Sequence, residues 1–249
     1  MKRIDLNCDR GGSLGAWRMG DDAGLLELVS SANIACGFHA GDPVIMHETV
    51  TLAVARGVAI GAHVSLPDLQ GFGRREMQLR ADEVHAMTLY QIGALAAFCR
   101  AAGTRLAHVK PHGALYNMAA RERTLADAIA RAVHAFDPRL ALFGLAGSAL
   151  IDAGTALGLA VVAEAFADRR YLIDGSLRPR GDAGAVIGDA GAATAQALAI
   201  VGDGKVIAAH GETGKVQAGT LCPHGAGGHA GHVAPRRRAA REPAGRPTR

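Results

Sequence analysis

The segment Ser31–Pro43, SANIACGFHAGDP, carries in a few residues the pattern that recurs along this 249-residue chain. It begins with a short apolar run, Ala32–Cys36, of the kind found in strands that are covered on both faces. A loop of small residues follows and bears two polar side chains, His39 and Asp42. Asp42 and Pro43 predict the start of a helix, because aspartate caps free backbone N–H groups and proline fits the first helical position. The segment therefore predicts a strand, a polar loop and a helix.

The same alternation repeats along the chain and predicts parallel strands joined by crossover helices. The expected strands are Ile4–Cys8, Ala32–Cys36, Val58–Ala62, Leu106–Val109, Leu140–Leu145, Leu159–Ala163 and Thr220–Cys222. Asp82 is expected to cap the helix that follows Arg80, and another helix is expected around Ala192–Val201. We therefore predict an α/β protein with one domain, since α/β barrels often use about 200–250 residues.

Composition and charge exclude several classes of function. The formal net charge is +4, but residues 233–249 hold six arginines and one glutamate, so the rest of the chain is close to neutral. A near-neutral body with 4% aromatic residues argues against a nucleic-acid surface. No apolar run reaches the roughly 18 residues of a membrane span, and no signal peptide is visible. We expect a cytoplasmic protein without nucleic-acid or membrane partners.

Polar side chains gather at the C-terminal end of each expected strand. They are Asn7, Asp9, His39, Asp42, His63, Asp68, Lys110, His112, Tyr116, Asn117, Glu164, Asp168, Arg169 and His224. Because the carboxyl ends of parallel strands converge on one mouth, we expect these groups to share an active site. A lone histidine is usually structural, but four at strand ends favour a functional cluster. Asn7 and Asp9 lie two residues apart, so on a strand they share a face.

The stretch Gly71–Arg75, GFGRR, predicts a flexible loop that bears two guanidinium groups. Such a loop can hold a carboxylate or phosphate by bidentate hydrogen bonds and close over the mouth. A solvated arginine pair is equally compatible with the sequence. The stretch Gly211–Val216 lacks the spacing and the hydroxyl of a GxxxxGK[ST] phosphate loop. If the protein uses ATP, it does not bind the nucleotide through such a phosphate loop.

Nine segments resemble, nearly word for word, the LamB/YcsF (lactam-utilisation) family, which supplies one of the subunits of bacterial 5-oxoprolinase. The matching stretches are Ile4–Asp9 (IDLNCD), Ser31–Pro43, Ile60–His63 (IGAH), Pro67–Arg75 (PDLQGFGRR), Leu89–Leu95 (LYQIGAL), His108–Met118 (HVKPHGALYNM), Gly144–Ser148 (GLAGS), Glu164–Tyr171 (EAFADRRY) and Cys222–Gly225 (CPHG). The resemblance implies a (β/α)7-type barrel over residues 1–225, related to the glycoside hydrolase/deacetylase superfamily. It also implies ATP-dependent cleavage of 5-oxo-L-proline to L-glutamate, with ATP and Mg²⁺ handled together with partner subunits B and C.

Within that reaction, Asp9, His63 and His112 are expected to act as acid–base or water-positioning groups, and Lys110 to stabilise developing negative charge. The expected substrate-binding residues are Asn7, His39, Asp42, Arg74, Arg75, Tyr116 and His224. No metal ligand is assigned. Two alternatives stay open. One is a stand-alone, deacetylase-like hydrolase with a metal on Asp9, His63 and His112. The other is a non-catalytic subunit that presents substrate to a partner.

The sequence departs from the family pattern in two places. Gly12 stands where the pattern has glutamate, so an acidic group expected at the mouth is missing. After His224 and Gly225 the family continues with aspartate and an amphipathic helix, whereas Ala226 begins a segment rich in Gly, Ala, Pro and Arg. We expect residues 226–249 to form a disordered basic tail. Gly, Ala, Pro and Arg have GC-rich codons, and an out-of-frame reading of a GC-rich gene yields these residue types. We therefore hypothesise a frameshift near Ala226, with an evolved basic tail as the alternative.

Overall fold

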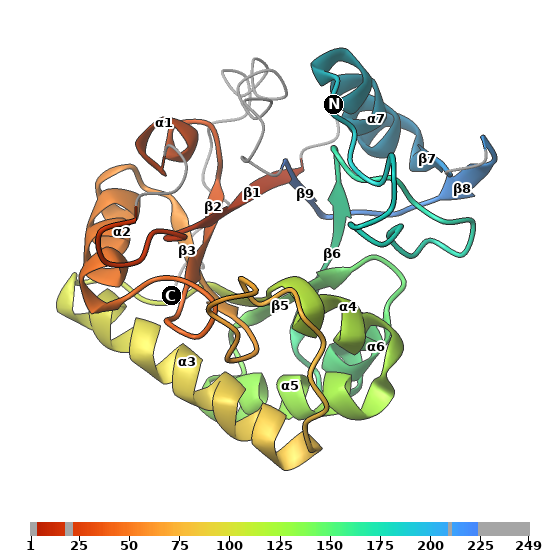
Figure 1. Cartoon of the computed structure of the whole chain (residues 1–249). Helices are drawn as coiled ribbons and strands as arrows, with labels where there is room; N and C mark the ends of the chain where they lie inside the picture. The colour runs from red at the N-terminus through yellow and green to blue at the C-terminus, as the bar shows by residue number, and fades with distance from the viewer. Residues whose placement is uncertain (1–3, 18–21, 209–210, 224–249) are drawn as a thin grey trace, which may run out of the picture.

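A closed barrel of seven parallel strands forms the centre of the molecule (Figure 1). The computed structural model describes residues 4–17, 22–208 and 211–223. The barrel strands are β1 (Asp5–Arg10), β2 (Ser31–Ala35), β3 (Ala59–Val64), β4 (His108–Pro111), β5 (Ala141–Leu145), β6 (Ala160–Phe166) and β9 (Thr220–Cys222). Strand β1 closes the ring, because it pairs with β2 on one side and with β9 on the other. Every expected strand is present, and the predicted α/β barrel is confirmed.

Helices surround this barrel (Figure 1). They are α1 (Asp22–Leu26), α2 (Pro43–Ala55), α3 (Ala81–Ala101), α4 (Gly113–Arg121), α5 (Arg123–Phe136), α6 (Ala149–Ala156) and α7 (Ala190–Asp203). A short antiparallel pair, β7 (Lys205–Ile207) and β8 (Thr213–Lys215), follows α7. Together α7 and this pair lie beside β6 and β9, away from α2 and α3 (Figure 1). The helix predicted around Ala192–Val201 is thus confirmed as the centre of α7.

The two predicted helix caps have different outcomes. Asp42 caps α2 as expected, since its carboxylate accepts the backbone N–H groups of Val44 and Ile45 at 2.8 and 2.9 Å. The prediction for Asp82 was wrong: α3 begins at Ala81, and Arg80 is its N-cap residue. Asp82 lies inside the first turn, where a carboxylate still interacts favourably with the positive end of the helix dipole. Its side chain binds the Arg80 guanidinium.

Apolar packing is divided between two clusters. The larger one joins β1–β5 to the inner faces of α2, α3, α5 and α6, and includes Ile34, Ile60 and Leu142. The second one joins β6 and β9 to α7, and includes Phe166 and Ile200. Several strand residues are polar although they are buried: Asn7, Asn33, His63, His108, Lys110, Glu164 and Thr220. This polar interior is where the site is built.

Two glycines make room for functional side chains. At Gly61 on β3, a Cβ atom would collide with the imidazole ring of His108 on the neighbouring strand β4. Gly73 has a φ of +65°, and a Cβ atom there would lie 2.7 Å from Cβ of His39 and collide with Ser65 Oγ. Glycine is required at both positions because any side chain would push the loop or the ring away.

Some predictions concern features that the structure does not describe. His224, the domain boundary at 225 and residues 226–249 lie outside the described residues. Across the described part of the chain, no helix combines the length and the apolar character needed to span a bilayer.

Candidate active site

The ammonium group of Lys110 lies at the centre of the polar interior. Its Nζ atom is 2.7 Å from Glu164 Oε1 and 3.1 Å from Asp9 Oδ1 and from Asn7 Oδ1. Burial by itself lowers the pKa of Lys110, but the carboxylates of Asp9 and Glu164 outweigh it and raise that pKa well above its ordinary value. Lys110 is therefore a permanent cation whose three N–H donors all have acceptors.

Side-chain amides fix the orientation of these groups. Asn7 Nδ2 donates to Glu164 Oε1 and to Thr220 Oγ1, both at 2.8 Å. Asn33 Nδ2 donates to Asn7 Oδ1 at 2.7 Å and to Asp9 Oδ1 at 2.9 Å. Asn7 and Asp9 thus contact the same neighbours, which confirms that they share a face of β1.

A second cluster consists of three buried histidines, His39, His63 and His112. His63 Nδ1 is 2.9 Å from the Lys110 carbonyl, and His112 Nε2 is 2.9 Å from the Phe72 carbonyl. A carbonyl oxygen only accepts hydrogen bonds, so these two ring nitrogens carry the protons. The other nitrogens, His63 Nε2 and His112 Nδ1, face each other at 3.0 Å. Two lone pairs at that distance repel, so a proton or a cation must lie between them.

A proton fits this gap well. Asp9 Oδ2 lies 3.3 Å from His63 Nε2, and a carboxylate there stabilises positive charge. Burial, followed by the charge of the neighbouring His63, lowers the pKa of His112 to about 3, so positive charge is unfavourable on the His112 ring. The arrangement forms a proton path from Asp9 through His63 to His112.

A metal ion is the other possible occupant. The 3.0 Å separation suits two neighbouring ligands of one ion at roughly 2.1 Å each. Ligand atoms of His39, His63 and His112 lie within 4.8 Å of one another. However, the His39 ring stacks on His112 with centroids 4.0 Å apart and planes 11° apart. An ion in the plane of the His112 ring is therefore out of the plane of the His39 ring, so His39 and His112 cannot both bind one ion.

The loop after β3 holds the histidines in place. Phe72 has a left-handed backbone, with φ of 54°, and its carbonyl oxygen meets His112. Such a conformation is costly for a residue with a side chain and tends to occur at functional sites. The Gly73 carbonyl accepts the backbone N–H of Ala114 at the start of α4, so the loop is docked on that helix.

The two arginines of this loop have separate roles. Arg75 binds the carboxylate of Asp68 through its side chain, and this hydrogen bond is the main reason that the pKa of Asp68 falls to about 2. Arg74, in contrast, lines a cavity at the mouth of the barrel, and Arg75 does not. The predicted guanidinium pair is thus divided between a structural ion pair and the cavity.

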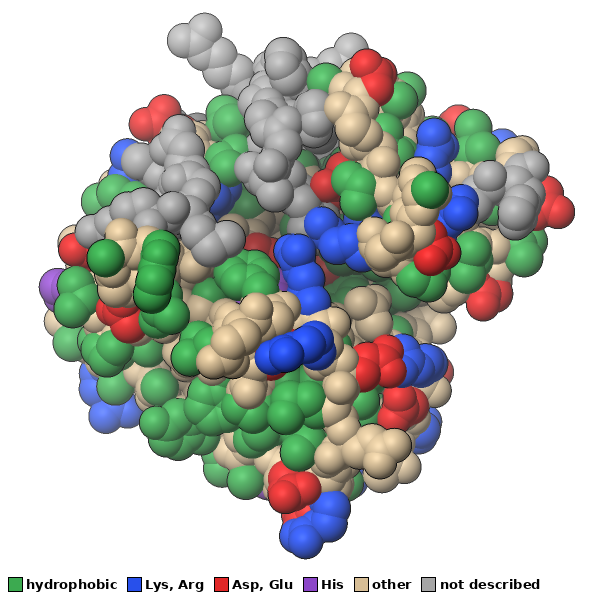
Figure 2. Space-filling view, in the orientation of Figure 1, with side chains coloured by type: hydrophobic (Ala, Val, Ile, Leu, Met, Phe, Trp, Pro, Cys, Tyr) green, Lys and Arg blue, Asp and Glu red, His purple; other side chains and the backbone are tan. Residues whose placement is uncertain are grey.

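The cavity has a volume of about 830 Å³ and opens at the strands' carboxyl ends. Asp9, His63, Lys110 and His112 line its inner part, and Figure 2 shows Lys and Arg side chains gathered around the central hollow of this face. Among the predicted substrate-binding residues, Arg74 and Tyr116 also line the cavity. Asn7 lies behind it in the network of Lys110.

The remaining predicted residues lie elsewhere. His39 packs behind His112. Asp42 does not line the described cavity; besides capping α2, it accepts the backbone N–H of Gly15 at 2.8 Å. Its contact with the first loop is therefore structural.

Tyr116 presents a buried hydroxyl group near Glu164. Burial raises the pKa of Tyr116 well above its ordinary value, and the charge of Glu164 adds to this effect. The Tyr116 hydroxyl faces the Glu164 carboxylate, and a hydrogen bond between the two side chains also raises this pKa. The hydroxyl therefore stays protonated.

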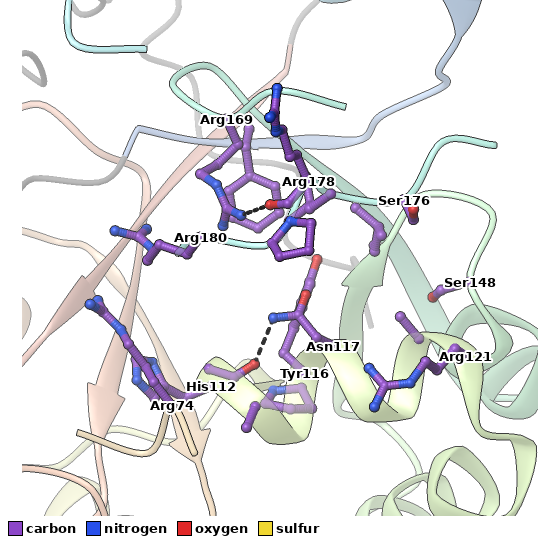
Figure 3. A pocket seen from close by; sticks show the side chains of 18 of the residues that line it. Arg74, His112, Tyr116, Asn117, Arg121, Ser148, Arg169, Ser176, Arg178 and Arg180 are labelled. Atoms are coloured by element: carbon purple, nitrogen blue, oxygen red, sulfur yellow. Dashed lines mark hydrogen bonds between the residues drawn. The ribbon is translucent and has the colours of Figure 1, made fainter. Parts of the chain in front are cut away.

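Sequence reasoning missed several members of the site. Asn33 and His108 lie inside strands, and the signal that could have revealed them is a polar residue within an apolar run; His108 binds Asn33 Oδ1 at 2.7 Å. Glu164 was noticed at its strand end but received no role. Arg178 and Arg180 line the cavity from the segment after β6, where no periodicity marks their position (Figure 3).

Comparison with known proteins identifies the family of this chain. The LamB/YcsF family model matches residues 4–248, past the point near 225 where the composition changes. The 5-oxoprolinase A subunit of Methylococcus capsulatus is 60% identical over 95% of this chain and 91% of its own length, and that of Tolumonas auensis is 55% identical over 96% of each. The crystal structure of the lactam utilization protein from Thermus thermophilus has a TM-score of 0.89 and 52% identity, over 94% of this chain and 95% of that one. This chain belongs to the LamB/YcsF family.

Proposed function

We propose that this chain is the A subunit of a 5-oxoprolinase and that the lactam ring opens in the cavity at the barrel mouth. The observation that carries the proposal is the convergence of Asp9, His63 and His112 on a proton-sized gap at the cavity wall. The names of the relatives support the choice of substrate.

The chemistry requires both activation of the amide and proton transfer. Adding water to 5-oxo-L-proline gives L-glutamate, and coupled ATP hydrolysis consumes a second water and yields ADP and phosphate. Phosphorylation of the carbonyl oxygen by ATP would turn a resonance-stabilised amide into a better electrophile. The attacking water must then lose a proton, and the ring nitrogen must gain one before it leaves.

We assign the proton transfers to the histidine path. His112 Nδ1 and His63 Nε2 share one proton, and Asp9 stabilises the positive charge when it lies on His63. The cluster can accept a proton from water and return it to the ring nitrogen. Lys110 receives a narrower role than the sequence suggested: its donors are all engaged, so it orients and neutralises Asp9 and Glu164.

ATP and Mg²⁺ belong to the proposal as reactants of the complete complex. The described residues contain no phosphate loop of the GxxxxGK[ST] type, so we propose that subunits B and C provide or share nucleotide binding. The arginines around the cavity mouth, described below, suit the phosphate groups of such a reactant.

Reconstitution tests the proposal. We expect ATP-dependent glutamate release from 5-oxoproline by the chain together with its partner subunits, and none by the chain alone or by the partners alone. Efficient turnover by the isolated chain, or turnover by the partners without it, would contradict the assignment.

A metal-dependent hydrolase is the second candidate, favoured by the 3.0 Å gap between His63 and His112. Elemental analysis of protein purified without chelators separates the two. A stoichiometric transition metal that His112→Asn removes would support the metal reading.

A further inference from the structure

Three arginines from two loops point into the outer part of the cavity (Figure 3). Arg74 comes from the loop after β3, and Arg169 and Arg180 come from the segment between β6 and α7. Arg180 lies between the other two in this view (Figure 3), and the charge of Arg180 lowers the pKa of both Arg74 and Arg169 after the larger effect of burial. The three side chains thus repel one another.

Of the three arginines, Arg169 is held in the least favourable environment for a charged group. It is 5% exposed, and burial followed by Arg180 lowers its pKa to about 10. Its Nη2 donates to the Arg178 carbonyl at 2.7 Å, but its Nε has no hydrogen-bond partner. A buried guanidinium with an unused donor is unfavourable unless a ligand completes its hydrogen bonds.

The carboxylates around the cavity do not neutralise these arginines. Asp9 binds Lys110, Glu76 binds Arg121 at 2.9 Å, and Asp182 lies 3.5 Å from Arg178. Asp174 accepts hydrogen bonds from Ser176. None of Arg74, Arg169 and Arg180 has a carboxylate within ion-pair distance in the described parts of the chain. Three cations therefore face one cavity without an ion pair among the described residues, although the charge of Asp168 acts on Arg169 and that of Asp9 acts on Arg74.

We propose that Arg74, Arg169 and Arg180 form a binding site for a phosphate group. 5-Oxoproline offers one negative charge, its carboxylate, whereas a phosphate group offers about two and several acceptor oxygens. Arginine forks match phosphate geometry by bidentate hydrogen bonds. The cavity, at about 830 Å³, has room for a lactam and a phosphate group together.

The proposal rests on the proposed function only for the identity of the lactam. Two sources share this chemistry: the terminal phosphate of ATP, and a lactam that has been phosphorylated on its carbonyl oxygen. In either case the three arginines would hold the phosphate group at the mouth. This place is outside the proton path of Asp9, His63 and His112.

Calorimetric titration of the full chain with inorganic phosphate tests the site. We expect Arg180→Gln and Arg169→Gln to weaken phosphate binding about tenfold or more, since each loses charge-assisted hydrogen bonds. Arg121→Gln is the matched control, because Arg121 lines the same cavity but is paired with Glu76; its affinity should stay within about twofold of the wild type. If Arg169→Gln does not fold, Arg180→Gln, which removes a half-buried loop side chain, still decides the question.

A second titration identifies the source. Competition between phosphate and a non-hydrolysable ATP analogue would support the site and point to nucleotide. Phosphate binding that the analogue does not affect, and that 5-oxoproline strengthens, would support it and point to a phosphorylated lactam. Absent phosphate binding, or equal losses in the Arg180 and Arg121 variants, would overturn the proposal. Glutamate release by the wild-type complex is measured separately, so this failure is distinguishable from failure of the proposed function.

Discussion

Charged side chains are arranged differently in the inner part of the cavity and at its mouth. Inside, Lys110 has an acceptor for each of its donors, and Asp9 and Asn7 are held by the same neighbours. At the mouth, Arg180 repels both Arg74 and Arg169, and none of the three forms an ion pair within the described residues. The inner groups are thus arranged before any ligand arrives, which suits proton transfer, whereas the outer groups gain their partners from the ligand.

The largest effect on stability should come from Lys110→Met. This change leaves Asp9 and Glu164 without their cation, and breaking a buried ion pair on one side typically costs about 3–5 kcal/mol of unfolding free energy. Urea denaturation followed by circular dichroism measures it. Arg121→Met is the control at the mouth, where an exposed ion pair should cost less than about 1 kcal/mol. Equal losses in the two variants would mean that the inner network is no more important than a surface pair.

Gly61→Ala tests how tightly the inner network is packed. The new methyl group would collide with the His108 ring, and overpacking of this kind costs about 1–3 kcal/mol. Gly93→Ala in α3 is the control: a methyl group there meets nothing within 4 Å, and alanine favours the helix by about 1 kcal/mol. A Gly61→Ala protein as stable as the wild type would show that His108 has space to move.

The buried histidines should make stability depend on pH. Burial, and then the neighbouring His112 and His63, hold the pKa of His39 well below its ordinary value of 6.5. As the pH falls below 6.5, the unfolded chain gains a proton on His39 that the folded chain does not. The unfolding free energy therefore decreases toward acid, by at most about 1.4 kcal/mol per pH unit for this residue, until the folded-state pKa is reached.

His39→Phe removes this contribution while keeping an aromatic ring on His112. We expect its unfolding free energy to decrease less than that of the wild type between pH 6.5 and 5. A measurement at pH 8, where His39 is neutral in both states, isolates the change in packing. Identical slopes for the two proteins would contradict the effect of burial on His39.

The smallest expected effect on stability concerns the mouth. In phosphate-free buffer, Arg180→Gln should change the unfolding free energy by less than about 0.5 kcal/mol, or raise it slightly, because it removes repulsion from Arg74 and Arg169. Adding phosphate should stabilise the wild type more than this variant. A clear loss of stability in phosphate-free buffer would show that Arg180 has a structural role.

The fold could be predicted because buried parallel strands leave apolar runs in the sequence, and polar residues mark where those runs end. Asn7, Asp9 and Lys110 were found by this signal, and the resemblance to the family gave the barrel. Asn33 and His108 escaped because they lie within strands, where a single polar residue looks like an exception. Only the closed barrel brings Asn33 to Asn7 and Asp9, and His108 to Asn33.

The mouth was harder to predict because its geometry depends on irregular loops. The adjacent residues Arg74 and Arg75 look equivalent in sequence. In the structure, however, Arg75 forms an ion pair with Asp68, whereas Arg74 lines the cavity. Arg178 and Arg180 lie in a Gly- and Ala-rich segment without periodicity, so nothing in the sequence indicates that they reach the site. Loop conformation and long-range ion pairs decide such positions.

The central claim is that the Asp9, His63 and His112 path performs the proton transfers of lactam opening. Its most direct test is ATP-dependent glutamate release by the complex reconstituted with Asp9→Asn and, separately, with His112→Asn. General acid–base groups typically contribute about 10²–10⁴-fold, so we expect kcat to fall at least about a hundredfold in both variants while the complex still assembles. Undiminished turnover in both would contradict the claim.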